Sequence, residues 1–306
     1  MTENDRAWTR SDLGEAAYAA LAKGMPASKL WSLLLSVVEQ RSQRATAALH
    51  QQWQNDRFVQ PSYIDQRTLL ELDSQLLAAA AEFEAVELSP LAPLGVCSSV
   101  AVGSQNRVVS TVRGTEVVSD PTNVLALESA RRLRADPECV VRLATSHRCV
   151  RAQEVPQVPG FAATFRMFCM TTAGHERKDQ GFLSAALLDH IQTHLRALDR
   201  LEQHGYAFPE RSLRILVAPE REALGQRLAA SLTQMPVTVE PLEHRYYDGV
   251  RFMLSARSSN GAPIPLIDGG AFDWLRRLAS NHKLVLVASA LGSQLAAYLY
   301  RPEAKP

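Results

Sequence analysis

The 306-residue sequence predicts an α+β protein in which a largely antiparallel sheet is flanked by helices and preceded by a helical segment. Three features point to this class. Segments of helical period, such as residues 65–83, are separated by short runs of alternating apolar and polar residues, and residues 141–170 predict a long hairpin. We expect residues 1–60 to form the N-terminal helical segment and residues 61–306 to form one core domain.

The composition argues against several classes of function. Basic and acidic residues nearly balance, at 33 and 32, so the chain lacks the basic excess typical of nucleic-acid-binding proteins. The four cysteines show no C-x-x-C spacing, so neither a zinc knuckle nor a disulfide framework is indicated. No signal peptide and no apolar run long enough to span a membrane is evident, and we expect a cytoplasmic protein without a membrane partner.

The core begins with a helix at residues 65–83, whose leucines at positions 69, 72 and 76 share one face. This helix leads into an alternating segment, residues 84–91, which we expect to be a strand closed by Pro90. Proline cannot donate a hydrogen bond to a sheet, so it belongs at the end or edge of a strand. A long helix feeding such a strand often forms a subunit interface.

Residues 108–119 predict a second hairpin, which turns at Arg113. Asp120 then caps a helix that has Pro121 as its first residue. Asp120 and Thr122 therefore lie at a strand-to-helix corner, where side chains can point into a cleft. Capping alone explains the aspartate, but it does not exclude a second role in ligand binding.

Several arginines lie on the hairpin at residues 141–170, at positions 148, 151 and 166. Guanidinium groups offer planar sets of donors that suit phosphate or carboxylate, so the hairpin is a candidate anion site. The alternative is that these arginines occupy exposed strand positions and form salt bridges with their neighbours.

A helix at residues 183–205 carries His190 and His194, whose i, i+4 spacing is that of paired metal ligands on a helix. No glutamate follows His190 and no third ligand is obvious. We therefore interpret both as surface histidines and expect no metal.

The remaining segments alternate in type. A strand, a helix and a strand are predicted at residues 213–217, 220–232 and 237–239, followed by strand-rich segments at 245–253 and 265–270. A buried strand at 284–289 then turns into a C-terminal helix.

Taken in order, these segments resemble the catalytic core of class II aminoacyl-tRNA synthetases, closest to the histidyl branch. That branch includes the catalytically silent regulatory subunit of ATP phosphoribosyltransferase. Pro90 matches the proline of motif 1, Arg148 matches the phosphate-binding arginine of motif 2, and Tyr246 and Tyr247 match the tyrosine pair of the histidyl branch. The resemblance implies a six- or seven-stranded antiparallel sheet and a homodimer formed through the Pro90 segment.

The same resemblance implies a site for an amino group. Thr122 matches a threonine of the family's amino-group-binding segment, and Asp120 stands where the family has glutamate. This exchange keeps the negative charge, so binding of an ammonium group is expected to persist.

Other functional positions of the family are replaced. Val150 stands in place of the adenine-reading glutamate, Leu242 in place of the catalytic arginine, and Gln294-Leu295 ends the segment that should carry the arginine of motif 3. Loss of one electrostatic donor typically costs on the order of hundredfold in rate. Aminoacylation is therefore not expected, no anticodon-binding domain is expected, and tRNA is not an expected partner.

Three functions fit the sequence. The first is a paralogue that has lost aminoacylation and binds a small amino-acid-like or nucleotide-like ligand as a regulatory or accessory homodimer, with a protein partner as a further possibility. The second is a ligase that uses ATP with Mg²⁺ to acylate an amine other than tRNA, with Arg148 as its candidate catalytic residue and Arg151 or Arg251 replacing the missing arginine. The third is an interaction protein with a relic cleft.

In each case the expected cleft is the same. Its ligand-binding candidates are the polar residues that the segments above bring to the sheet: Arg113, Glu116, Asp120, Thr122, Arg148, Arg151, Tyr246, Tyr247 and Asp268.

Overall fold

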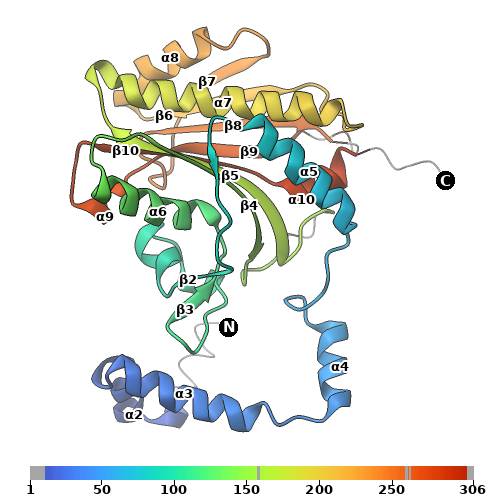
Figure 1. Ribbon diagram of the computed structural model, residues 1–306, viewed down its shortest axis with the longest axis vertical. Coiled ribbons are helices and arrows are strands. Elements are labelled where there is room, and N and C mark those ends of the chain that lie inside the picture. Colours follow the sequence, from blue (N-terminus) through green and yellow to red (C-terminus); the bar gives the residue numbers. More distant parts are fainter. Residues whose placement is uncertain (1–10, 157–158, 259–260, 262, 302–306) are drawn as a thin grey trace, which may run out of the picture.

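The computed structural model describes residues 11–156, 159–258, 261 and 263–301. Its centre is an eight-stranded sheet with the order β1-β4-β5-β10-β9-β8-β6-β7 (Figure 1). Neighbouring strands are antiparallel except for the pairs β1–β4 and β6–β7, which are parallel. The predicted class, α+β with a largely antiparallel sheet flanked by helices, is confirmed. The sheet has eight strands rather than six or seven, and β1 is only two residues long.

The strands of the large sheet are β1 (Glu84–Ala85), β4 (Val141–Val150), β5 (Thr164–His175), β6 (Ser212–Val217), β7 (Val237–Pro241), β8 (Val250–Arg257), β9 (Pro263–Phe272) and β10 (Leu284–Leu291). A small second sheet contains β2 (Leu91–Pro93) and β3 (Thr115–Val117). The core helices are α5 (Gln66–Ala79), α6 (Pro121–Ala135), α7 (Gly181–Glu202), α8 (Glu222–Ala230), α9 (Trp274–Ala279) and α10 (Ser293–Leu299).

Helices cover both faces of the large sheet (Figure 1). On the α7 face, leucines of α5 and α7 pack against Phe168 and Met170 of β5. On the α6 face, residues of α6 and α9 pack against Leu143 of β4 and Cys169 of β5. Successive residues of a strand point to opposite faces, so even-numbered side chains of β4 and β5 belong to the α7 face and odd-numbered ones to the α6 face.

The histidines of α7 are not surface residues, and that part of the sequence interpretation was wrong. His190 and His194 are both 0% exposed. Nδ1 of His190 and Nε2 of His194 each lie 2.8 Å from Oγ of Ser289, and Nε2 of His190 lies 3.0 Å from Oγ1 of Thr172. The i, i+4 spacing places both rings on the buried side of the helix, where strand hydroxyls contact both nitrogens of His190 and Nε2 of His194.

Two strand predictions also need correction. Residues 84–91 do not form one strand, because β1 ends at Ala85 and Pro90 lies immediately before β2 instead of closing a strand. The hairpin at residues 108–119 is present but shorter than predicted: Ser110 and Glu116 form an antiparallel bridge flanked by two backbone hydrogen bonds, and β3 has its strand partner in β2. The polar residues between these short segments favour turns over a continuous ladder.

The N-terminal segment contains α2 (Glu15–Ala19), η1 (Ala20–Gly24), α3 (Ala27–Arg41) and α4 (Thr46–Asn55). None of these helices contains a buried residue, and in Figure 1 they lie apart from the large sheet. In the part of the chain that the structure describes, no helix is both long and apolar enough to cross a membrane.

Candidate functional site

Two adjoining cavities lie at the ends of β4, β5, β9 and β10. We call the first, of about 270 Å³, the polar chamber, and the second, of about 220 Å³, the apolar chamber. They form one cleft because four residues border both: Arg151, Met167, Leu266 and Gly292.

The N-terminus of α6 supplies a carboxylate to the polar chamber. Oδ1 of Asp120 accepts hydrogen bonds from the backbone N (3.0 Å) and from Oγ1 (2.7 Å) of Thr122. This is the predicted helix cap. Capping occupies Oδ1 and leaves Oδ2, which lies 3.9 Å from Nη2 of Arg151.

Arg151 is fixed where β4 has just ended. Its Nε donates to the backbone oxygen of Ser119 at 3.0 Å, and its guanidinium lies over the ring of Phe165, 4.9 Å from the centroid. Two anchors therefore hold one edge of the group, while Nη2 extends toward Asp120. A guanidinium held in this way can receive an anionic group of a ligand without first losing side-chain freedom.

Asp268 of β9 organises the opposite wall. It accepts two hydrogen bonds from Arg251, at 2.9 and 2.6 Å, and a third from the hydroxyl of Tyr247 at 2.9 Å. The hydrogen bond with Asp268 raises the pKa of Arg251, and burial followed by the Asp268 charge raises the pKa of the Tyr247 phenol. Tyr247 is therefore a neutral hydroxyl that points at a carboxylate.

Glycine is required in β9 for these contacts to form. A Cβ at Gly269 would lie 2.5 Å from Cβ of Ser289 and 2.6 Å from Cζ of Phe252. A Cβ at Gly270 would lie 2.7 Å from Cδ1 of Tyr247. The close approach of the strands and of the tyrosine ring leaves no space for a side chain.

Aromatic rings complete the polar chamber. Tyr246, Tyr247 and Phe272 lie with ring centroids 5.0 to 5.5 Å apart, and Trp274 continues the cluster behind Phe272. Burial is the main cause that raises the pKa of Tyr246. Neutral aromatic rings beside carboxylates make a site that favours a cation.

Six of the residues predicted from the sequence line the polar chamber together: Asp120, Thr122, Arg151, Tyr246, Tyr247 and Asp268. Glu116 lies elsewhere and is 2% exposed. Its carboxylate accepts from the backbone N of Gly95 and Cys97 and from the side chain of Gln105, which ties the β2–β3 region together. Arg113 is exposed beside the start of β3 and does not line the cleft.

Arg148 also lies outside both chambers. It is paired in register with Arg166, whose Nε lies 2.6 Å from Oδ2 of Asp73 on α5, so strand alternation puts the Arg148 side chain on the α7 face. Burial, followed by the charge of Arg166, lowers the pKa of Arg148. Of the hairpin arginines, Arg151 borders both chambers and Arg166 borders the apolar chamber.

Phe165 and Phe272 line the cleft and were not among the predicted residues. Phe165 lies opposite Cys149 in the hairpin register, which places it on the α6 face. The alternation of side chains along the predicted hairpin could therefore have placed Phe165 on this face from the sequence. Among the described residues, no group of three or more histidine, cysteine or acidic side chains is arranged to hold a metal ion.

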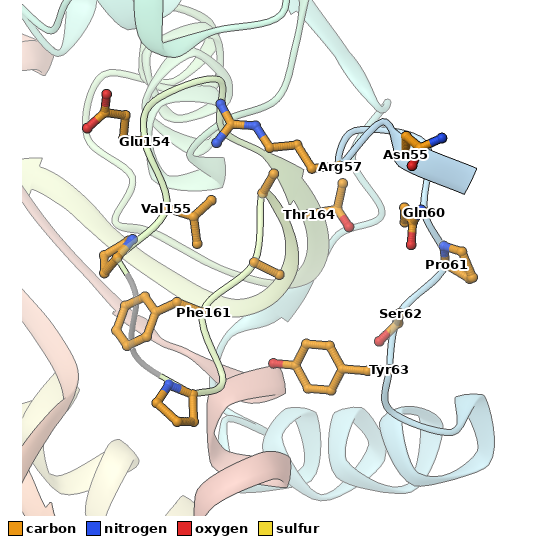
Figure 2. Close-up of a pocket in the computed structure, with 14 residues that line it drawn as sticks. Asn55, Arg57, Gln60, Pro61, Ser62, Tyr63, Glu154, Val155, Phe161 and Thr164 are labelled. Carbon is orange, nitrogen blue, oxygen red and sulfur yellow. The ribbon is translucent and has the colours of Figure 1, made fainter. Parts of the chain in front are cut away.

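A third, open hollow of about 990 Å³ lies beside the apolar chamber, between residues 55–63 and the loop at 154–164 (Figure 2). Here residues 55–63, which link α4 to α5 and which we call the N-terminal linker, contact the loop that joins β4 to β5. Nη2 of Arg57 donates to the backbone oxygen of Ala152 at 3.0 Å, and the hydroxyl of Tyr63 donates to that of Gly160 at 2.6 Å. The linker therefore helps to fix the loop that closes the outer side of the apolar chamber.

No protein-family model matches the sequence, and no curated protein matches it. Solved structures do resemble the chain. One is an ATP phosphoribosyltransferase regulatory subunit/histidyl-tRNA synthetase from Bacillus halodurans, with a TM-score of 0.58, 13% identity, and 78% of this chain and 81% of that chain covered. A histidine–tRNA ligase subunit from Alicyclobacillus acidocaldarius gives a TM-score of 0.58 at 14% identity, covering 79% and 95%.

Two further structures are similar to this chain over a smaller share of their own length. Apo histidyl-tRNA synthetase of Staphylococcus aureus gives a TM-score of 0.54 at 13% identity, and 76% of this chain corresponds to 64% of that one. A putative threonyl-tRNA synthetase of Aeropyrum pernix gives 0.58 at 11% identity, covering 76% and 58%. The chain has the fold of the class II aminoacyl-tRNA synthetases, with histidyl-tRNA synthetase-like proteins among its structural neighbours.

Proposed function

We propose that this protein binds a small amino-acid-like ligand in the polar chamber and acts as a regulatory or accessory homodimer rather than as an aminoacyl-tRNA synthetase. The observation that supports the proposal most directly is the presence of opposite charges side by side in one cavity. Asp120 and Arg151 both line the polar chamber, and Oδ2 of the aspartate lies 3.9 Å from Nη2 of the arginine.

The spacing of this pair suits a zwitterion. At 3.9 Å the two groups attract each other but make no hydrogen bond, so a ligand can replace their mutual interaction with shorter ones. The ammonium group would lie against Oδ2 of Asp120 and the rings of Tyr246 and Tyr247. The carboxylate would lie against the guanidinium of Arg151.

The charges around the cleft argue against chemistry on a nucleotide. Two arginines line the cleft among the described residues. Nη2 of Arg151 lies 3.9 Å from Oδ2 of Asp120, and Nε of Arg166 forms an ion pair with Oδ2 of Asp73 at 2.6 Å. Transfer of a phosphoryl or adenylyl group depends on donors that stabilise developing negative charge. Because Arg166 is engaged by Asp73, Arg151 is the one arginine among the described lining residues that is left for such a charge, and the Asp120 carboxylate lies beside it.

A calorimetric titration with the L-amino acids, preceded by a thermal-shift screen, tests the proposal. A ligand that binds the folded chain raises the melting temperature by mass action. We expect Asp120→Asn, which keeps a capping oxygen but removes the charge, to weaken binding at least about tenfold, as loss of a charged hydrogen bond does.

Asp65→Asn is the matched control. Asp65 caps α5 through the same bond, Oδ1 to the backbone N of Arg67 at 2.9 Å, and does not line the cleft. Equal weakening in both variants would indicate an effect of helix capping. If no amino acid and no amine shifts the melting temperature, the cleft is a relic and the proposal fails.

The second candidate is an ATP-dependent ligase that acylates an amine other than tRNA, and the position of Arg151 in the cleft favours it. Exchange of pyrophosphate into ATP, dependent on a carboxylate substrate and abolished by Arg151→Ala, would establish that activity. It would exclude a purely regulatory role.

The homodimer belongs to the same proposal. Leu91 and Leu94 flank the end of the Pro90 segment and are 42% and 41% exposed. Two exposed leucines on a short two-stranded sheet offer apolar area that a second copy of the chain would cover.

A further inference from the structure

We propose that the apolar chamber binds a hydrocarbon group of the same ligand, so that the occupant of the cleft is an amine joined to an aliphatic or aryl tail and carries no phosphate. This inference rests on the proposed function, because the polar chamber must hold the amine.

The lining of the chamber is the first support. Its walls are formed mainly by apolar side chains from the loop after β4, from β5, from β9 and from α10, including Val155, Phe161, Phe165, Leu266 and Leu295. At about 220 Å³ the chamber exceeds the ~150 Å³ of an engineered apolar cavity that accepts benzene. A single ring or a short alkyl chain therefore fits.

The adjacency of the two chambers is the second support. Arg151, Met167, Leu266 and Gly292 border both, so the apolar chamber lies directly beside the chamber in which a ligand would be held at Asp120. The thioether of Met167 lies 3.7 Å from Nη2 of Arg151 and marks the boundary between polar and apolar walls.

The charge balance is the third support, and it disfavours phosphate. Arg166 is neutralised by Asp73, and Asp268 by Arg251. The charged residues that remain around the two chambers are Asp120, Glu154 and Arg151, which leave one excess negative charge. A di- or triphosphate would add several negative charges to this surface, whereas an ammonium group reduces the excess.

A homologous series of primary n-alkylamines, from propyl to octyl, tests the inference by calorimetric titration. Burial of one methylene group raises the affinity by about three- to fourfold. We expect the dissociation constant to fall by up to that factor for each carbon until the chamber is filled, and then to level off.

Phe161→Ser and Leu295→Gln replace two walls of the chamber and should flatten the dependence of the dissociation constant on chain length. Phe161 is 43% exposed on its loop, so its replacement spares the core even if Leu295→Gln disturbs α10. Val140→Ser is the control, because Val140 is 47% exposed and lies outside the cleft.

The outcomes separate the inference from the function on which it rests. Binding of propylamine with no gain along the series leaves the proposed function intact and overturns the inference. A gain that persists equally in Phe161→Ser, Leu295→Gln and Val140→Ser also overturns it, because the tail then lies elsewhere. Displacement of octylamine by ATP would assign the chamber to a nucleotide. Binding of an amino acid without binding of any alkylamine overturns the inference alone, whereas failure of every amine and every amino acid to bind removes the proposed function itself.

Discussion

Oδ2 of Asp120 and Nη2 of Arg151 lie 3.9 Å apart in the lining of the polar chamber, while the cap on α6 holds the other oxygen of the aspartate. Two local anchors, the helix N-terminus and the backbone oxygen of Ser119, therefore bring opposite charges together without letting them form a hydrogen bond. A site of this kind is prepared for a ligand that carries both charges.

The first prediction concerns the two arginines of the hairpin. Arg151→Met should weaken binding of an amino acid at least about tenfold, because a charge-assisted contact with the carboxylate is lost. Isothermal titration calorimetry measures the change.

Arg148→Met is the internal control for that prediction. The side chain of Arg148 belongs to the α7 face, so its loss should leave the affinity unchanged within about twofold. The reverse pattern, with Arg148 essential and Arg151 dispensable, would restore the assignment of Arg148 that the sequence suggests.

A second prediction concerns pH. Burial lowers the pKa of His194 to about 3 and that of His190 well below its usual value, whereas both should titrate near 6.5 in the unfolded chain. Between the folded-state and unfolded-state pKa values, the unfolded chain binds more protons than the folded protein. The free energy of unfolding should therefore fall as the pH drops below about 6.5. Each histidine contributes a slope that approaches about 1.4 kcal/mol per pH unit once the pH lies well below 6.5.

Urea unfolding between pH 7 and pH 5 measures this slope. His194→Leu should reduce it by about one histidine's share, and His282→Leu, which removes an exposed side chain, should not. An unchanged slope in His194→Leu would mean that other groups cause the acid sensitivity.

Replacement of a glycine in β9 supplies a third prediction. Gly269→Ala would place a methyl group 2.5 Å from Cβ of Ser289, so the strands must separate or Phe252 must move. Overpacking of this type typically costs about 1–3 kcal/mol, which a chemical denaturation curve detects.

Gly181→Ala is the comparison for that variant. A Cβ at Gly181, the first residue of α7, meets only Cβ of Arg177, at 3.6 Å, which is an ordinary contact. Its effect should stay near zero or be slightly stabilising. Similar losses in both variants would show that the crowding at Gly269 relaxes easily.

The fourth prediction concerns assembly. If the Pro90 segment forms the homodimer interface, Leu91→Glu should convert the dimer to a monomer, because a charge would be buried in an apolar contact. Light scattering coupled to gel filtration measures the mass. Trp53→Glu, on α4 and 53% exposed, is the matched surface change and should leave the dimer intact. A dimer that survives Leu91→Glu uses another surface.

Much of the core could be predicted because its information is local. Helical period predicts α5, α6 and α7 at nearly their observed positions, and the cap at Asp120 follows from the pair Asp120-Pro121. Short strands were less predictable: β1, β2 and β3 contain two or three residues each, and too few side chains alternate in such a segment to give a period.

By itself the sequence determined the class of fold, the helix cap that positions Asp120 and the presence of arginines on the central hairpin. Tertiary structure decided which arginine faces the cleft, because adjacent strand residues point to opposite faces and a shift of one position exchanges those faces. It also decided the environment of His190 and His194, since only the packing of α7 against β10 brings Ser289 between the two rings. Side-chain direction in a sheet and the identity of distant neighbours depend on contacts between segments far apart in the chain, and no local pattern encodes them.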